Sequence, residues 1–120
     1  MNTTSQGALA EEQAARYLEQ KGYEVLAQNF RAAGGEIDLV VYQKNTLVFV
    51  EVKQRAYDAF GGPVGAVTPT KQKRIAKAAT QFVKAHPRLK YEQIRFDVVA
   101  ILPEKWEHIE SAFFPPRTTL

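Results

Sequence analysis

Cysteine is absent from this sequence of 120 residues, and histidine occurs only twice. Without thiols, the chain can form neither a disulfide nor a cysteine-ligated zinc site, which suits a protein of the reducing cytoplasm. No apolar run approaches the ~20 residues needed to cross a bilayer, and the first residues lack the basic and apolar segments of a signal peptide. We therefore expect a cytoplasmic protein that does not associate with membranes.

Internal repeats and low-complexity segments are absent too, and the length suits one domain over residues 1–120, with a core of about 5–114 and a loose tail at 115–120. The hydrophobic pattern predicts an α/β domain. The expected helices cover 5–21 and 68–86, and the expected strands cover 23–30, 36–42, 47–53 and 93–102, with an edge strand over 106–114. The glycine-rich stretch 56–67 is expected to be a loop, either closing over a substrate or simply connecting two elements.

Charged residues interrupt two expected strands, at Glu36-Ile37-Asp38 and at Glu51-Val52-Lys53. If the turn between the strands centres on residues 44 and 45, Asp38 lies directly opposite Glu51. Side chains paired in this way have Cβ atoms about 4.5–5.5 Å apart, where two like charges destabilise a sheet. A divalent cation would offset that repulsion. Lys53 shares the face of Glu51 because strand side chains alternate, so the pattern indicates a metal-dependent phosphodiesterase site.

The alternative interpretation is that these charges lie on the solvated face of an ordinary antiparallel hairpin. The strand 47–53 argues against it, because both of its faces are largely apolar. One face carries valines and the other carries larger side chains: Val48, Val50 and Val52 on one, Leu47 and Phe49 on the other. Such a strand is usually central and buried, so Glu51 and Lys53 would need partners.

The net charge of +3 is unevenly distributed. Residues 71–90 include seven basic side chains and no acidic one, which leaves the rest of the chain with a net charge of −4. Helical spacing places Lys73, Lys77 and Lys84, with Arg74 at the margin, opposite the apolar face of the second helix, whereas Lys71 lies closer to that face and is expected to reach the sheet. The stripe suits a phosphate-binding surface, or else a lysine-rich solvent face.

The first expected helix carries a glutamate on its apolar side. At 100° per residue Glu11 falls about 20° from Leu18, whereas Glu12 points away. A carboxylate on a buried face is costly unless it has a partner. Glu11 is therefore either a site residue or a partly exposed residue at the flank of the helix.

The order Asp, spacer, Glu-x-Lys resembles the signature of the PD-(D/E)xK nuclease superfamily, which includes restriction endonucleases and Holliday-junction resolvases. More closely, the chain resembles the YraN family of small bacterial proteins over residues 7–101. The matching runs are Ala10-Glu11-Glu12-Gln13-Ala14-Ala15-Arg16-Tyr17-Leu18, Gly22-Tyr23, Asn29-Phe30-Arg31, Gly35-Glu36-Ile37-Asp38-Leu39, Val48-Phe49-Val50-Glu51-Val52-Lys53, Arg55, Gly61, Lys71 and Arg95-Phe96-Asp97-Val98-Val99. The resemblance implies a restriction endonuclease-like fold: a mixed β-sheet flanked by helices, with an αβββαβ core.

The resemblance also implies site residues. Asp38 and Glu51 would coordinate Mg²⁺ or Mn²⁺ together with the Val52 carbonyl, and Lys53 would orient the attacking water or the phosphate. Glu11 becomes a catalytic residue that could hold a second metal or its water shell, with Glu36 a weaker candidate for that role. The residues expected to contact nucleic-acid phosphates are Arg55, Lys71, Lys73, Arg74 and Lys77.

The resulting hypothesis is a metal-dependent endonuclease acting on structured or branched DNA, and the analogy with the resolvases suggests a homodimer. The alternative is a non-catalytic nucleic-acid-binding module that keeps the fold and the basic helix but cleaves nothing. A third reading, a protein-interaction domain, leaves the charged cluster unexplained. Cleavage that depends on a metal separates the first reading from the other two.

Overall fold

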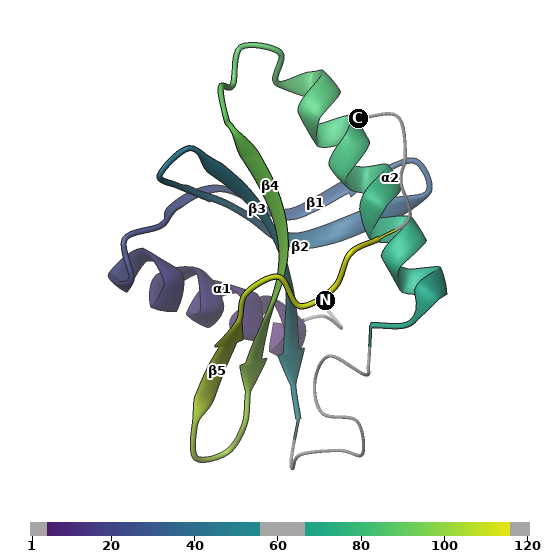
Figure 1. Ribbon diagram of the computed structural model, residues 1–120. Helices are drawn as coiled ribbons and strands as arrows, with labels where there is room; N and C mark the ends of the chain where they lie inside the picture. Colours follow the sequence, from purple (N-terminus) through teal and green to yellow (C-terminus); the bar gives the residue numbers. More distant parts are fainter. Residues whose placement is uncertain (1–4, 56–66, 116–120) are drawn as a thin grey trace.

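The computed structural model of the protein describes residues 5–55 and 67–115 (Figure 1). Within these ranges the chain contains both helices and strands, as the α/β expectation requires. The elements are α1 (Ser5–Gln20), β1 (Glu24–Ala32), β2 (Gly35–Gln43), β3 (Thr46–Gln54), α2 (Pro69–Ala85), β4 (Gln93–Ile101) and β5 (Trp106–Ile109). The predicted αβββαβ order is confirmed, with β5 added after it.

The strands form one five-stranded sheet in the order β1-β2-β3-β4-β5. Neighbouring strands are antiparallel except β3 and β4, which are parallel, so the sheet is mixed as expected. A parallel pair needs a crossover connection, and α2 lies within the segment that joins β3 to β4. The strand β3 has a neighbour on each side, which confirms its predicted central position.

A tight turn fixes the register of β2 against β3. Both of its central residues have positive φ angles, 51° and 63°, which is the backbone of a type I′ hairpin turn. Pairing begins with Gln43 opposite Thr46 and runs to Leu39 opposite Val50. The predicted register is therefore confirmed, and the ladder ends one position before Asp38 and Glu51.

The two helices cover opposite faces of the sheet (Figure 1). Side chains of α1 pack with one alternating set of β3 residues, including Val48 and Val50. Side chains of α2 pack with the other set, including Leu47 and Phe49. Both faces of β3 are therefore buried, as its sequence predicts. A charged residue near the end of this strand follows directly on residues of the apolar core.

A glycine brings α2 close to the start of β2. A Cβ atom on Gly35 would overlap the backbone carbonyl of Arg74, so only glycine permits this approach. The exposed residues of the helix, which include Lys73, Arg74, Lys77 and Lys84, lie opposite its buried side, as predicted. The packing thus places the N-terminal half of α2 beside the strand that carries Asp38.

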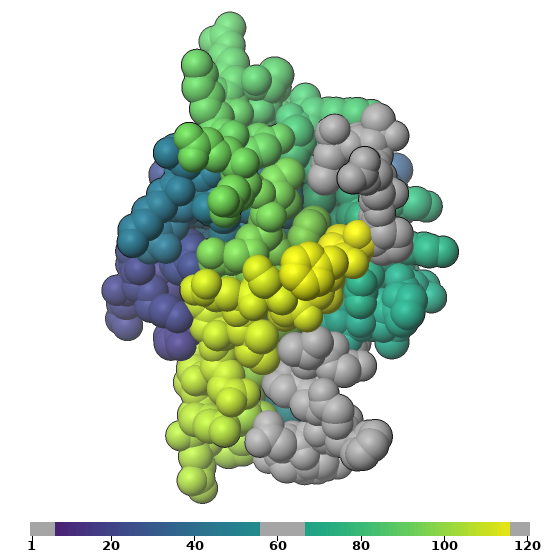
Figure 2. All heavy atoms as spheres, viewed as in Figure 1, coloured from purple at the N-terminus to yellow at the C-terminus, as the bar shows by residue number. Residues whose placement is uncertain are grey.

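The C-terminal part of the chain differs from the prediction. The edge strand ends at Ile109 rather than near 114, because Ser111 has a φ of 50° and the chain turns back, with the Ala112 N–H donating to the Phe96 carbonyl at 2.8 Å. Phe113 is then buried in the core beneath α2. In Figure 2 this yellow segment crosses the front of the molecule.

The expected glycine-rich loop and the expected loose tail lie almost entirely outside the described residues. No helix in the described part of the chain is long and apolar enough to span a membrane.

Candidate functional site

Asp38 lies on β2 just beyond the last pair of the β2–β3 ladder. Its Oδ2 accepts a hydrogen bond of 2.8 Å from the Val52 backbone N–H, so the carboxylate replaces a strand partner for β3. Burial raises the pKa of Asp38 to about 8, and the nearby negative charges of Glu51 and Glu11 act in the same direction. Asp38 therefore binds its proton more tightly than an exposed aspartate does in the ligand-free protein.

Glu11 reaches Asp38 from the other side of the site. Its side chain, on α1, is hydrogen-bonded to the Asp38 carboxyl group, and burial raises the pKa of Glu11 as well. Two carboxyl groups in such contact share a proton because both cannot ionise cheaply. The prediction that Glu11 faces inward is confirmed, while Glu12 is exposed and pairs with Arg16 at 3.2 Å.

Glu51 completes the acidic group and is held by two lysines. The Glu51 side chain is 4% exposed, and its Oε2 lies 3.2 Å from Lys53 Nζ and 2.7 Å from Lys71 Nζ. Burial lowers the pKa of Lys53, although Glu51 opposes this effect. Burial also acts to lower the pKa of Lys71, but its contact with Glu51 prevails and raises that pKa. The expectation that Lys71 reaches the site is confirmed.

These side chains line a common polar cavity of about 210 Å³. All four residues predicted to be catalytic line it, together with Val52 and Lys71. The remaining lining residues are Gly7, Ala10 and Gln54. The sheet thus contributes two carboxylates and a lysine, while each helix contributes one further charged side chain from its N-terminal half.

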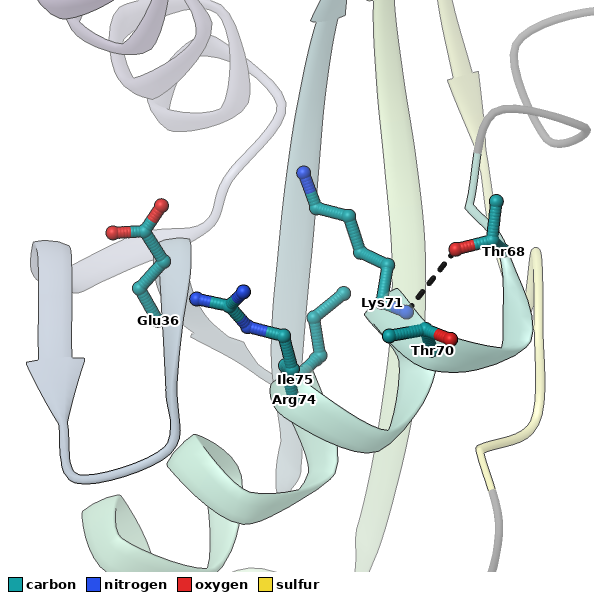
Figure 3. Close-up of a pocket in the computed structure, with 6 residues that line it drawn as sticks. All are labelled: Glu36, Thr68, Thr70, Lys71, Arg74 and Ile75. Atoms are coloured by element: carbon teal, nitrogen blue, oxygen red, sulfur yellow. Dashed lines mark hydrogen bonds between the residues drawn. The ribbon is translucent and has the colours of Figure 1, made fainter.

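A second cavity, of about 230 Å³, lies between β2 and the first turns of α2 (Figure 3). Its lining residues are Glu36, Thr68, Thr70, Lys71, Arg74 and Ile75, so Lys71 borders both cavities. Figure 3 shows the side chain of Arg74 extending from α2 toward Glu36. Glu36 also pairs with Arg31 at 3.5 Å. The weaker candidate Glu36 therefore borders this second cavity and not the first.

The other predicted phosphate contacts are more scattered. Arg55 lines neither cavity, and its guanidinium donates to the Gln54 carbonyl at 3.0 Å. Lys73 and Lys77 are exposed on α2 and line neither cavity. Of the five basic candidates, the structure brings Lys71 to the acidic site and Arg74 to the adjoining cavity.

The donor chemistry of the first cavity fits a hard divalent cation. Carboxylate oxygens and a backbone carbonyl are the ligands that Mg²⁺ prefers. The Val52 N–H faces Asp38, and because the N–H and C=O of a strand residue point to the same side, its carbonyl faces that way too. No three acidic, histidine or cysteine side chains among the described residues form a ready-made metal group. A cation at Glu51 would compete with the two lysine ammonium groups that already contact its carboxylate.

A second charged cluster was not anticipated. Asp97 on β4 is fully buried and accepts hydrogen bonds from Arg95 at 2.9 Å, from His108 Nε2 at 2.7 Å and from the Ser111 N–H at 3.0 Å. Burial acts to raise the pKa of Asp97, but these hydrogen bonds prevail and lower it. Lys21 Nζ lies 2.8 Å from His108 Nδ1. The cluster joins the end of α1 to β4 and β5, and we assign it a structural role.

From its place in an expected edge strand, the sequence predicts a solvent-facing His108, and this prediction is wrong, because the side chain is only 2% exposed. The available signal is Asp97 itself, an acidic residue within a largely apolar strand. Such a residue needs buried partners. For His86 the sequence predicts a position at the end of the second helix, and it lies at the end of α2, where its Nδ1 is 2.8 Å from the Phe82 carbonyl oxygen.

Comparison with known proteins gives a family match and many relatives. The model of "Uncharacterised protein family UPF0102" matches residues 10–101. A UPF0102 protein of Syntrophomonas wolfei is 47% identical over 111 residues, which cover 89% of this chain and 96% of that protein. UPF0102 proteins of Thermodesulfovibrio yellowstonii and Cupriavidus pinatubonensis are 45% and 43% identical, over 90% and 92% of this chain and 95% and 87% of their own lengths. The expected likeness to this family of small bacterial proteins is confirmed.

Proposed function

The chain belongs to the UPF0102 family, and from the chemistry of its buried carboxylate–lysine site we propose that it is a metal-dependent endonuclease acting on structured or branched DNA. One observation carries the proposal. Glu11, Asp38, Glu51 and Lys53 line a single polar cavity at the end of the β2–β3 hairpin. Clustered carboxyl groups with raised pKa values are unfavourable for a fold alone and typical of functional sites.

Each side chain has a distinct part in the proposed reaction. Asp38, Glu51 and the Val52 carbonyl would hold Mg²⁺ or Mn²⁺, and Glu11 would hold its water shell. The bound cation would lower the pKa of a water molecule and neutralise charge on the phosphate. Lys53 would orient the attacking water and stabilise the negative charge that develops on the phosphoryl oxygens. Its position on the rigid central strand suits this role, because the ammonium group is already directed at Glu51.

The flanking basic residues would position the nucleic acid. Lys71 and Arg74 lie beside the site, and Lys73 and Lys77 extend the positive surface along α2. Such contacts fix the register of a backbone without reading sequence. Cutting both strands of a branched substrate would need two sites, so we also propose a homodimer, the commonest closed assembly. Size-exclusion chromatography with light scattering tests that part independently.

Cleavage assays on four-way junction, flap, duplex and single-stranded DNA, with an RNA control, test the proposal. Each substrate is incubated with Mg²⁺, with Mn²⁺ or with EDTA. We expect metal-dependent cutting by the wild type that is lost in Asp38→Asn and Lys53→Ala. Lys84→Ala is the matched control, because Lys84 is exposed near the end of α2.

A second candidate function is a nucleic-acid-binding module without catalysis. The observation favouring it is that two lysines already neutralise Glu51. This reading predicts binding that weakens steeply with salt, with no cutting of any substrate in either metal. That combination of results would replace the endonuclease proposal.

A further inference from the structure

The two lysines that hold Glu51 differ in how firmly they are fixed. Lys53 lies two residues further along β3, and its side chain is 11% exposed. Lys71 comes from the first turn of α2, and its side chain is 40% exposed. A lysine side chain carries its charge on a flexible four-carbon stem. Lys71 is therefore the partner that can leave Glu51 without disturbing the sheet.

The second cavity can accept the Lys71 ammonium group when it leaves Glu51. Lys71 borders both cavities, and Figure 3 shows its side chain extending from the first turn of α2, away from Thr68 and Thr70. The side chains of Thr70 and Arg74 also border this cavity, and neither is hydrogen-bonded to any residue that the structure describes. Two free donor groups therefore lie beside the path of a displaced Lys71 ammonium.

We propose that Lys71 is a mobile counter-charge: it neutralises Glu51 in the metal-free protein, and when a divalent cation takes Glu51 it moves into the second cavity. There, with Arg74, it binds a nucleic-acid phosphate next to the cleaved bond. This inference rests on the proposed function, and it adds a coupling between metal binding and substrate binding. The substrate group is a phosphodiester of the backbone, read by charge and not by base identity.

Electrostatics require such an exchange. A glutamate that is 4% exposed must keep a positive partner. A dication beside Glu51 would repel both ammonium groups at close range in a cavity of about 210 Å³. Lys53 is held on the central strand, so Lys71 is the lysine that moves away from Glu51.

The second cavity is suited to the phosphate that Lys71 would meet. Arg74 supplies a planar guanidinium, which binds phosphate oxygens in pairs. Glu36 borders the same cavity, and its pairing with Arg31 at 3.5 Å offsets its negative charge. The region gains one positive charge when Lys71 arrives, so metal binding should strengthen nucleic-acid binding, and the converse must hold by linkage.

Calorimetric titration with Mg²⁺ or Mn²⁺ alone provides the first test, because it measures metal affinity without activity. Lys71→Met keeps an unbranched side chain that is one atom shorter and removes the charge that competes with the metal. We expect it to bind the metal about tenfold more tightly than the wild type. Lys84→Met, on the same helix, should match the wild type. Equal or weaker metal binding by Lys71→Met would overturn the proposal.

Binding of a phosphorothioate-protected branched DNA tests the second part of the proposal, that the displaced Lys71 binds a phosphate. Added Mg²⁺ should tighten binding by the wild type several-fold, and this gain should be absent in Lys71→Met. Arg74→Ala should weaken DNA binding in Mg²⁺ while leaving the affinity for the metal alone unchanged. A full metal-dependent gain in Lys71→Met would show that Lys71 does not move to the phosphate.

Amine labelling of the wild type needs no variant and so does not depend on variant folding. With an amine-reactive reagent and mass spectrometry, labelling of Lys71 should rise several-fold on adding Mg²⁺, while labelling of Lys84 stays constant. Unchanged labelling of Lys71 by a protein that binds Mg²⁺ and cuts DNA would refute the exchange alone. A wild type that binds no metal would refute both the exchange and the proposed function.

Discussion

Replacing Asp38 by asparagine should stabilise the metal-free protein at high pH. Asparagine retains a side-chain oxygen to accept the 2.8 Å hydrogen bond from the Val52 N–H. Its amide group can also donate to Glu11, which is the hydrogen-bonded neighbour of Asp38. The substitution therefore removes the charge of one carboxylate with little change in shape.

The pKa of Asp38 sets the size and the sign of the effect. Folding raises this pKa from 3.8 to about 8, and each unit corresponds to about 1.4 kcal/mol. The folded state binds the Asp38 proton more tightly than the unfolded state does. The contribution of this proton to the free energy of unfolding is therefore fully present below about pH 4 and is lost as the pH rises through 8. The ceiling is about 6 kcal/mol at alkaline pH. Relaxation and water entry reduce the cost of a buried charge, so we expect about 2 kcal/mol.

Urea unfolding in EDTA at pH 5, 7 and 9 measures this difference. Relative to the wild type, Asp38→Asn should gain stability steadily with pH and be about 2 kcal/mol more stable at pH 9. Glu12→Gln, an exposed acidic residue on α1, controls for the loss of a negative charge. The reasoning fails if Asp38→Asn is less stable than the wild type at pH 9, or if the difference does not vary with pH.

Three further predictions concern other parts of the chain. Glu11→Gln should lower the cleavage rate at least tenfold with unchanged circular dichroism, while Glu12→Gln cuts normally; equal rates would remove Glu11 from the site. Gly35→Ala should cost about 2 kcal/mol in urea unfolding, because the new methyl group overlaps the backbone of α2; an unchanged midpoint would contradict that packing. Asp97→Asn should cost about 3 kcal/mol, because it removes the buried carboxylate that holds His108 and the partly buried Arg95, and should not change metal affinity. A change in metal affinity would tie this cluster to the site.

Local patterns were enough to predict much of the site. The turn at residues 44 and 45 fixes the hairpin register, and that register alone brings Asp38 beside β3. The alternating faces of β3 predicted that Glu51 and Lys53 would need partners. The angular position of Lys71 on α2, apart from the exposed stripe, predicted that it would reach inward, and it contacts Glu51 at 2.7 Å.

The Asp97 cluster could not be predicted in the same way. Its partners come from the end of α1, from β4 and β5, and from the turn after β5. Periodicity describes one element at a time and does not show which elements meet. The short strand β5 makes His108 look peripheral, whereas its pairing opposite Val99 places the ring over the buried face of β4. Tertiary contacts, not local propensity, decide its burial.

The site forms where one strand pairing stops and the other continues. On the β2 side, the ladder ends at Leu39 opposite Val50, which frees Asp38 to use its carboxylate as a hydrogen-bond partner of β3. On the β4 side, pairing with β3 continues past Glu51 and Lys53 to Gln54. Glu51 and Lys53 therefore project from a strand that is held throughout its length. The adaptable groups are the two that the helices supply, Glu11 and Lys71. Adjustment to a metal or a phosphate should accordingly appear first in those side chains, while the backbone of β3 stays in place.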